Sequence, residues 1–101
     1  MAEFINPFSG MKPDRKLTDR ELTRAIRQAL AAEEEAVHLY EALADASENS
    51  LAAKVLQDVA DEERVHAGEF QQLLRVLLSD EEKLLAQGAD EVRELADEKQ
   101  D

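Results

Sequence analysis

The chain has 101 residues, of which 24 are acidic and 12 basic, so its formal net charge is −12. This length indicates one domain, and a hydrophobic content of 44% is too high for a disordered chain. The lack of cysteine excludes disulfides and thiolate metal sites, the acidic balance argues against nucleic acid, and no apolar run approaches the roughly 20 residues that cross a bilayer. We therefore expect a small, soluble, intracellular protein without a secretory signal.

Residues 1–17 show neither helical nor strand periodicity, because prolines and a glycine interrupt the pattern. We expect an irregular tail. It nevertheless holds Phe4 and Phe8, two of the four aromatic residues. We expect these apolar side chains to pack against another surface, either the chain's own helices or a partner subunit.

The first helix is predicted to begin at residues 18–21, where Thr18 and Glu21 form a capping box. Good helix formers then dominate, and neither proline nor glycine interrupts until well past Ala46. Residues 47–50 read as a turn in which Asn49 or Ser50 caps the next helix.

A second helix is predicted from about residue 51 to about residue 78. A second capping box at residues 79–82 opens a third, shorter helix, which Gly88 is expected to interrupt. We take residues 18–98 as one helical domain and residues 99–101 as a frayed end.

These elements predict an all-α fold, an antiparallel two-helix hairpin followed by a short C-terminal helix. Two helices of about 28 residues, each roughly 40 Å long, cannot cover their own apolar stripes. Pairing with a second copy to form a four-helix bundle is the stable solution.

Three polar residues interrupt the apolar stripes near mid-helix. Glu33 lies on the first helix in a stripe formed by Leu22, Ile26, Leu30, Val37, Tyr40 and Ala44. Glu63 and His66 lie on the second helix, in a stripe formed by Val55, Val59, Phe70, Leu73 or Leu74, and Leu77. No lysine or arginine lies on either stripe to neutralise them.

A buried, unpaired carboxylate costs on the order of several kcal/mol, against a domain stability of about 5–15 kcal/mol. The cost of burying the Glu33 and Glu63 carboxylates must therefore be offset by another interaction. A protonated His66 could pair with one of them, the positions could be partly hydrated, or the three could bind metal.

Glu63 and His66 form a Glu-x-x-His pair on one helical face, as in carboxylate-bridged dimetal sites of helical bundles. Such a site needs two single glutamates and two Glu-x-x-His pairs. This chain offers half of that set, which a twofold dimer completes. Four carboxylates would balance two divalent ions, and oxygen ligands with one imidazole per metal favour iron or manganese over zinc.

Residues 32–41 (AEEEAVHLYE) and 61–70 (DEERVHAGEF) resemble the two metal-binding helices of the encapsulated ferritins, half-length ferritin-like proteins housed inside encapsulin shells. The resemblance covers roughly residues 20–98. Residues 5–7 also resemble the start of relatives fused to the shell protein. The resemblance implies a ferritin-like four-helix bundle, a ferroxidase centre with two iron ions per dimer, an annular decamer, and a cytoplasmic location within an encapsulin nanocompartment.

The resemblance also implies roles for individual residues. Glu33, Glu63 and His66 from each of two chains would be the ligands, with Glu63 bridging the irons and Tyr40 close by. Glu35 matches one member of an acidic cluster that draws in ferrous iron.

This chain departs from the family pattern at Ala32, at Leu39 and in its C-terminal segment. Ala32 stands where relatives have another entry-site glutamate, for which Glu34 could substitute, and Leu39 replaces an aromatic residue of some relatives. His38 is expected to face solvent, with the entry site as its alternative. Standalone relatives end in a short shell-binding peptide. Its absence here leaves three explanations: it was removed, the domain was cut from a longer chain, or targeting works differently.

Three functions are compatible with these residues. The first is ferroxidase activity, with dioxygen or peroxide as electron acceptor. The second is iron binding or delivery without redox turnover. The third is a scaffold module, a hairpin that dimerises and docks through its tail.

Overall fold

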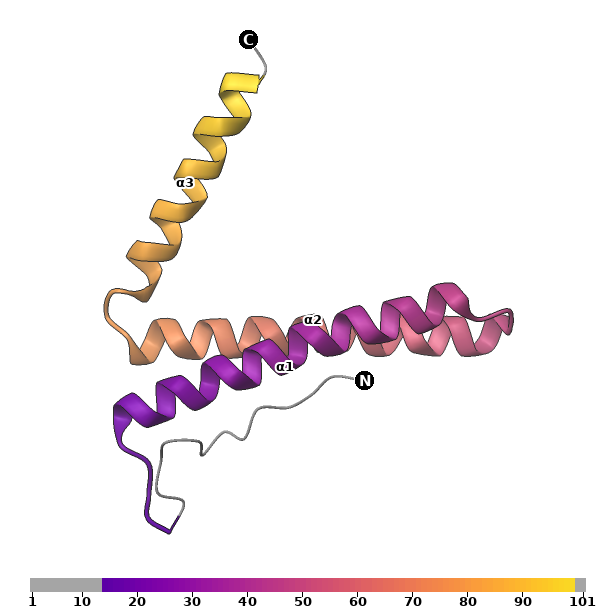
Figure 1. The fold of residues 1–101 in the computed structure, drawn as a ribbon, viewed down its shortest axis with the longest axis horizontal. Coiled ribbons are helices and arrows are strands. Elements are labelled where there is room, and N and C mark those ends of the chain that lie inside the picture. The colour runs from indigo at the N-terminus through magenta and orange to yellow at the C-terminus, as the bar shows by residue number, and fades with distance from the viewer. Residues whose placement is uncertain (1–13, 100–101) are drawn as a thin grey trace.

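The computed structural model describes residues 14–99, and the side chains of residues 14–98. These residues form three helices, α1 (Asp19–Ala46), α2 (Ser50–Leu77) and α3 (Glu81–Lys99), and contain no strand. Helices α1 and α2 lie antiparallel as a hairpin, and α3 leaves the end of α2 and points away from it (Figure 1). The predicted docking of Phe4 and Phe8 lies outside the described residues.

Both predicted helix starts in the hairpin are confirmed. The Thr18 hydroxyl accepts a hydrogen bond from the Glu21 N–H at 3.2 Å, and the Glu21 carboxylate accepts one from the Thr18 N–H at 3.0 Å. At the turn, Asn49 Oδ1 accepts from the Ala52 N–H at 3.0 Å, so Asn49 rather than Ser50 is the cap. These side chains accept hydrogen bonds from backbone N–H groups of the first helical turn, which have no carbonyl partner within the helix.

Two expectations for α3 are wrong. Helix α3 runs through Gly88 without a break, since a single glycine costs only about 1 kcal/mol relative to alanine and strong helix formers surround it. The helix also begins one residue later than a Ser79 cap requires. The Leu84 N–H donates to the Asp80 carbonyl, and the Glu81 carboxylate binds Arg27.

The two hairpin helices approach each other through small side chains. On α2 the buried residues are Ala60, Ala67 and Leu74, spaced by seven, and they differ from most of the stripe expected from the sequence. Val55 remains 53% exposed and Leu77 42% exposed. The single chain thus buries only part of its apolar surface in its own core and leaves the rest exposed.

Arg27 and Glu81 join α1 to the start of α3. The guanidinium donates two hydrogen bonds to the carboxylate, at 2.7 Å and 3.1 Å. Beyond this point α3 is exposed along its length. Among the described residues, none of the helices combines the length and the apolar character that crossing a membrane requires.

Candidate metal centre

The structure brings Glu33, Glu63 and His66 together at mid-hairpin. Glu33 projects from α1, while Glu63 and His66 project from one face of α2, since residues three apart on a helix are neighbours. Each offers one ligand atom, and these atoms all lie within 4.8 Å of one another. The three residues that interrupt the apolar stripes therefore form one cluster.

The imidazole lies within ion-pair distance of both carboxylates. His66 Nδ1 is 3.4 Å from Glu63 Oε1 and 3.7 Å from Glu33 Oε2. The His66 side chain is 48% exposed, whereas those of Glu33 and Glu63 are 22% and 20% exposed. The cluster is thus half-buried on its carboxylate side and open on its imidazole side.

Glu33 is the residue of the cluster whose ionised carboxylate is least well stabilised by its surroundings. The neighbouring Glu63 carboxyl and partial burial raise the pKa of Glu33, and His66 opposes them. Among the described residues, Glu33 Oε2 is buried without a hydrogen-bond partner. A buried oxygen without a partner carries a desolvation cost that a cation would remove.

The donor set fits a divalent iron or manganese ion. Two carboxylates and one imidazole supply hard oxygen donors and a borderline nitrogen, the combination that suits these metals. A second cation or a further set of ligands would have to approach from the open side, where His66 meets solvent. Among the described residues, this cluster supplies three ligands, which is half the set that a dimetal site in a helical bundle takes.

The other candidate residues lie outside the cluster. Tyr40 is half-buried on α1, seven residues or about 10 Å of helix beyond Glu33. Glu34 and Glu35 are exposed, and His38 faces solvent as expected. The roles of Tyr40 and Glu35 remain predictions.

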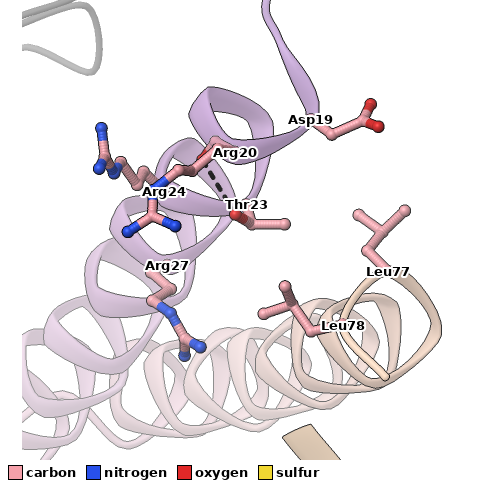
Figure 2. A pocket seen from close by; sticks show the side chains of 7 residues that line it. All are labelled: Asp19, Arg20, Thr23, Arg24, Arg27, Leu77 and Leu78. Carbon is pink, nitrogen blue, oxygen red and sulfur yellow. Dashed lines mark hydrogen bonds between the residues drawn. The ribbon is translucent and has the colours of Figure 1, made fainter. Parts of the chain in front are cut away.

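The sequence analysis did not single out a group of arginines near the N-terminal end of α1. Arg20, Arg24 and Arg27 line an open pocket together with Leu77 and Leu78 from the end of α2 (Figure 2). Their spacing of four and three residues, which places them on one helical face, was a readable signal.

The chain matches the Rubrerythrin family over residues 8–100. It is 49% identical over 69 residues to the encapsulin nanocompartment cargo protein EncC of Myxococcus xanthus, covering 68% of this chain and 52% of the relative. It is 42% identical over 91 residues to a ferritin-like–encapsulin shell fusion protein of Pyrococcus furiosus, covering 90% of this chain and 26% of the relative. The chain therefore spans about half of one relative and about a quarter of the other.

A solved structure has the same fold. The crystal structure of the encapsulated ferritin domain from Pyrococcus furiosus superimposes with a TM-score of 0.81 at 42% identity, covering 90% of this chain and 92% of that one. The all-α hairpin with a C-terminal helix and the resemblance drawn from residues 32–41 and 61–70 are both confirmed.

Proposed function

This chain belongs to the rubrerythrin family, and we propose that it is a ferroxidase whose di-iron centre forms between two copies of the chain. The observation that carries the proposal is the cluster of Glu33, Glu63 and His66, in which a buried carboxylate oxygen has no hydrogen-bond partner among the described residues. Iron is the substrate of this reaction.

A second copy would complete the site and cover the hairpin. Dimetal sites in helical bundles take two single glutamates and two Glu-x-x-His pairs, which is twice what one chain supplies. Val55, Leu73 and Leu77, which are 53%, 40% and 42% exposed, lie on the same stripe of α2 as the ligands. A twofold axis beside the cluster would bury this stripe and bring the two half-sites together.

Each residue would have a distinct part in the reaction. Glu33, Glu63 and His66 would hold the ions, and the resemblance to encapsulated ferritins assigns the bridging role to Glu63. The carboxylates favour the oxidised ions because these carry more positive charge. Two ferrous ions lose one electron each, and dioxygen takes up both electrons with two protons to give hydrogen peroxide. Peroxide can serve instead, giving water. Tyr40, two turns of α1 beyond Glu33, would border the centre, and Glu35 would draw ions inward.

The relatives suggest where the ferric product accumulates. One is named as an encapsulin nanocompartment cargo protein and another as a fusion to an encapsulin shell. We place this chain inside such a compartment, in an assembly of several dimers. Iron oxidised at the dimer interface would then be deposited in the surrounding shell.

Aerobic oxidation of ferrous iron by the purified chain tests the proposal, with the ferric absorbance and oxygen consumption followed together. Changing even an outer-sphere partner of a metal site costs about 10–100-fold, so Glu63→Ala and His66→Ala should lower the rate by about tenfold or more. Glu48→Ala, an exposed residue in the turn, is the matched control.

Native mass spectrometry with and without ferrous iron separates the possibilities. Two ions per dimer with oxygen consumption support the ferroxidase. Bound metal without oxygen consumption would instead indicate storage or delivery. Equal oxidation rates in parent and Glu63→Ala would refute the catalytic proposal.

A further inference from the structure

One side of α1 is half-buried although it points away from α2. Ile26 is 6% exposed in the hairpin core, and Gln28, two residues later, projects about 200° round the helix from it. Among the described helices, α2 alone packs along α1. Gln28 is nevertheless half-buried, as are Ala25 and Ala32 on one flank of it, whereas Ala31 on the other flank is exposed. We call Ala25, Gln28 and Ala32 the outer side of α1.

A buried oxygen on this outer side has no donor among the described residues. Gln28 Oε1 is closed to solvent, and within residues 14–98 nothing donates a hydrogen bond to it. Native structures seldom leave a buried amide oxygen in this state, because its lost hydration is then not replaced. The Gln28 side chain therefore indicates an occupant that covers the outer side and brings an N–H group.

The chain enters α1 along the same side. Glu21 lies seven residues before Gln28, and so nearly in line with it along the helix, and is 9% exposed. Arg15 donates hydrogen bonds to both Glu21 carboxylate oxygens, at 2.7 Å and 3.0 Å. The main chain at Arg15 is therefore folded back against α1, and the residues that precede it set out from the outer side.

Residues 8–13, which precede the described part of the chain, have a composition that suits this side. They contain Phe8 and Met11 and a single charged residue, Lys12. The outer side is likewise uncharged, and its two alanines leave space for larger apolar side chains. Polar backbone N–H groups accompany the apolar side chains in any such segment, so the same residues can supply the donor that Gln28 Oε1 requires.

The length of the segment also suits this side. Ser9 stands six residues before Arg15, which corresponds to about 20 Å of extended chain. Ala32 stands eleven residues after Glu21, which corresponds to about 16 Å of helix. A chain that starts at the Arg15–Glu21 pair and follows α1 therefore reaches Ala32 at about residue 9.

We infer that residues 8–13 lie along the outer side of α1 of their own chain, with Phe8 packed beside Ala32 and a backbone N–H donating to Gln28 Oε1. The Arg15–Glu21 pair anchors one end of this strap. The inference selects the chain's own helix, rather than a partner subunit, as the surface on which Phe8 docks. It needs no metal and does not involve the cluster of Glu33, Glu63 and His66.

Cross-linking of the full, metal-free chain tests this contact, since the parent has no cysteine. A chain carrying Ser9→Cys and Ala32→Cys is treated with a short bifunctional thiol reagent, and the product is weighed by mass spectrometry. The expected product is a single chain with an internal bridge. Ser9→Cys with Glu34→Cys is the control, because Glu34 is exposed and lies about 200° round α1 from Ala32. Its internal bridge should form about tenfold less, since the two thiols then have a low effective concentration.

A mixture of two chains separates the chain's own helix from a neighbour's. One chain carries only Ser9→Cys, and a second, mass-tagged chain carries only Ala32→Cys. The mixture should give little cross-linked dimer. A dimer yield that matches the internal yield of the double variant would place the segment on a neighbouring copy and overturn the inference, as would equal internal yields for Ala32→Cys and Glu34→Cys.

Gln28 supplies the second arm. Gln28→Glu keeps the shape of the side chain but puts a charge under the strap, so the internal yield of the Ser9–Ala32 double variant should fall about tenfold. Gln72→Glu makes the same change at an exposed position on α2 and should leave the yield unaltered. Circular dichroism confirms that both variants keep their helices. An internal yield that Gln28→Glu does not lower would overturn the role given to Gln28.

Discussion

Arg27 and Glu81 lie 54 positions apart in the sequence and meet as a bidentate pair, with Nη2–Oε1 at 2.7 Å and Nη1–Oε2 at 3.1 Å. The Arg27 guanidinium holds the pKa of the Glu81 carboxyl below its usual value. The pair ties the first turn of α3 to α1, and because a planar fork of two hydrogen bonds favours one direction, we expect it to restrict the angle at which α3 leaves the hairpin.

The first prediction concerns this pair. Glu81→Gln removes the charge and one of the two acceptors, so α3 should sample a wider range of orientations. Spin labels at Asp45→Cys and Gln87→Cys would report this as a broader distance distribution in a pulsed dipolar experiment. Glu82→Gln, at the exposed neighbouring position, is the control. Identical distributions in both variants would show that Arg27 does not orient α3.

The second prediction is a pH dependence at the start of α1. The hydrogen bond from Arg15 lowers the pKa of Glu21 from 4.5 to about 2, with the Thr18 N–H adding to the effect. A lowered pKa in the folded state stabilises the fold above pH 4.5, and this contribution disappears as the pH falls toward 2.

Glu21→Gln should therefore melt at a lower temperature than the parent at pH 6, with the difference shrinking below pH 4.5. Circular dichroism of both proteins in chelator, compared at each pH, isolates Glu21 from the other acids. A constant difference across this range would contradict the assignment.

The third prediction concerns Glu33, whose replacement should change two properties in opposite directions. Glu33→Gln removes the crowding of two carboxylates, so the metal-free chain should melt at a higher temperature than the parent. The same change removes a ligand, so added ferrous or manganous ion should stabilise it less. Metal at a hundred times its Kd stabilises a folded protein by about 2.7 kcal/mol.

Melting curves with and without metal under anaerobic conditions check both effects. Glu35→Gln, an exposed neighbour, serves as the control for the metal-free curve. A lower melting temperature of metal-free Glu33→Gln would mean that the carboxylate is stabilising rather than strained.

The fourth prediction concerns the packing of the hairpin. Leu74 is 1% exposed and is the largest side chain that α1 and α2 fully bury. Leu74→Ala should lower the free energy of unfolding by about 2–5 kcal/mol, because it removes buried surface and leaves a cavity. Val76→Ala, at a position 70% exposed, should change it by less than about 1 kcal/mol. Urea titrations at a fixed protein concentration measure both.

The fifth prediction concerns Gly88 within α3. Gly88→Ala should stabilise the helix by about 0.5–1 kcal/mol, because alanine loses less backbone entropy and its Cβ meets nothing within 4 Å. Ala89→Gly should cost a similar amount. Amide hydrogen exchange of residues 86–95 reports both changes. Faster exchange in Gly88→Ala would indicate that a neighbouring chain packs against Gly88 in the assembly.

Local signals in the sequence were sufficient to predict the two helices of the hairpin and where each begins. The Thr18 box and the Asn49 cap act within four residues, so they could be read without knowledge of the rest of the chain. Glu33, Glu63 and His66 were likewise readable, because charges on an otherwise apolar face are costly and stand out. Gly88 was misread because a single glycine is a weak signal, which its helix-forming neighbours outweighed.

The sequence by itself determined that α1 and α2 form, where they begin, and that three polar side chains occupy their apolar faces. Only the tertiary structure decided that Ala60 and Ala67, rather than Val55 and Leu77, face α1, because closest approach of two helices depends on side-chain size across the contact. It also decided that Arg27 and Glu81 meet, since this pair joins positions whose proximity no local pattern encodes.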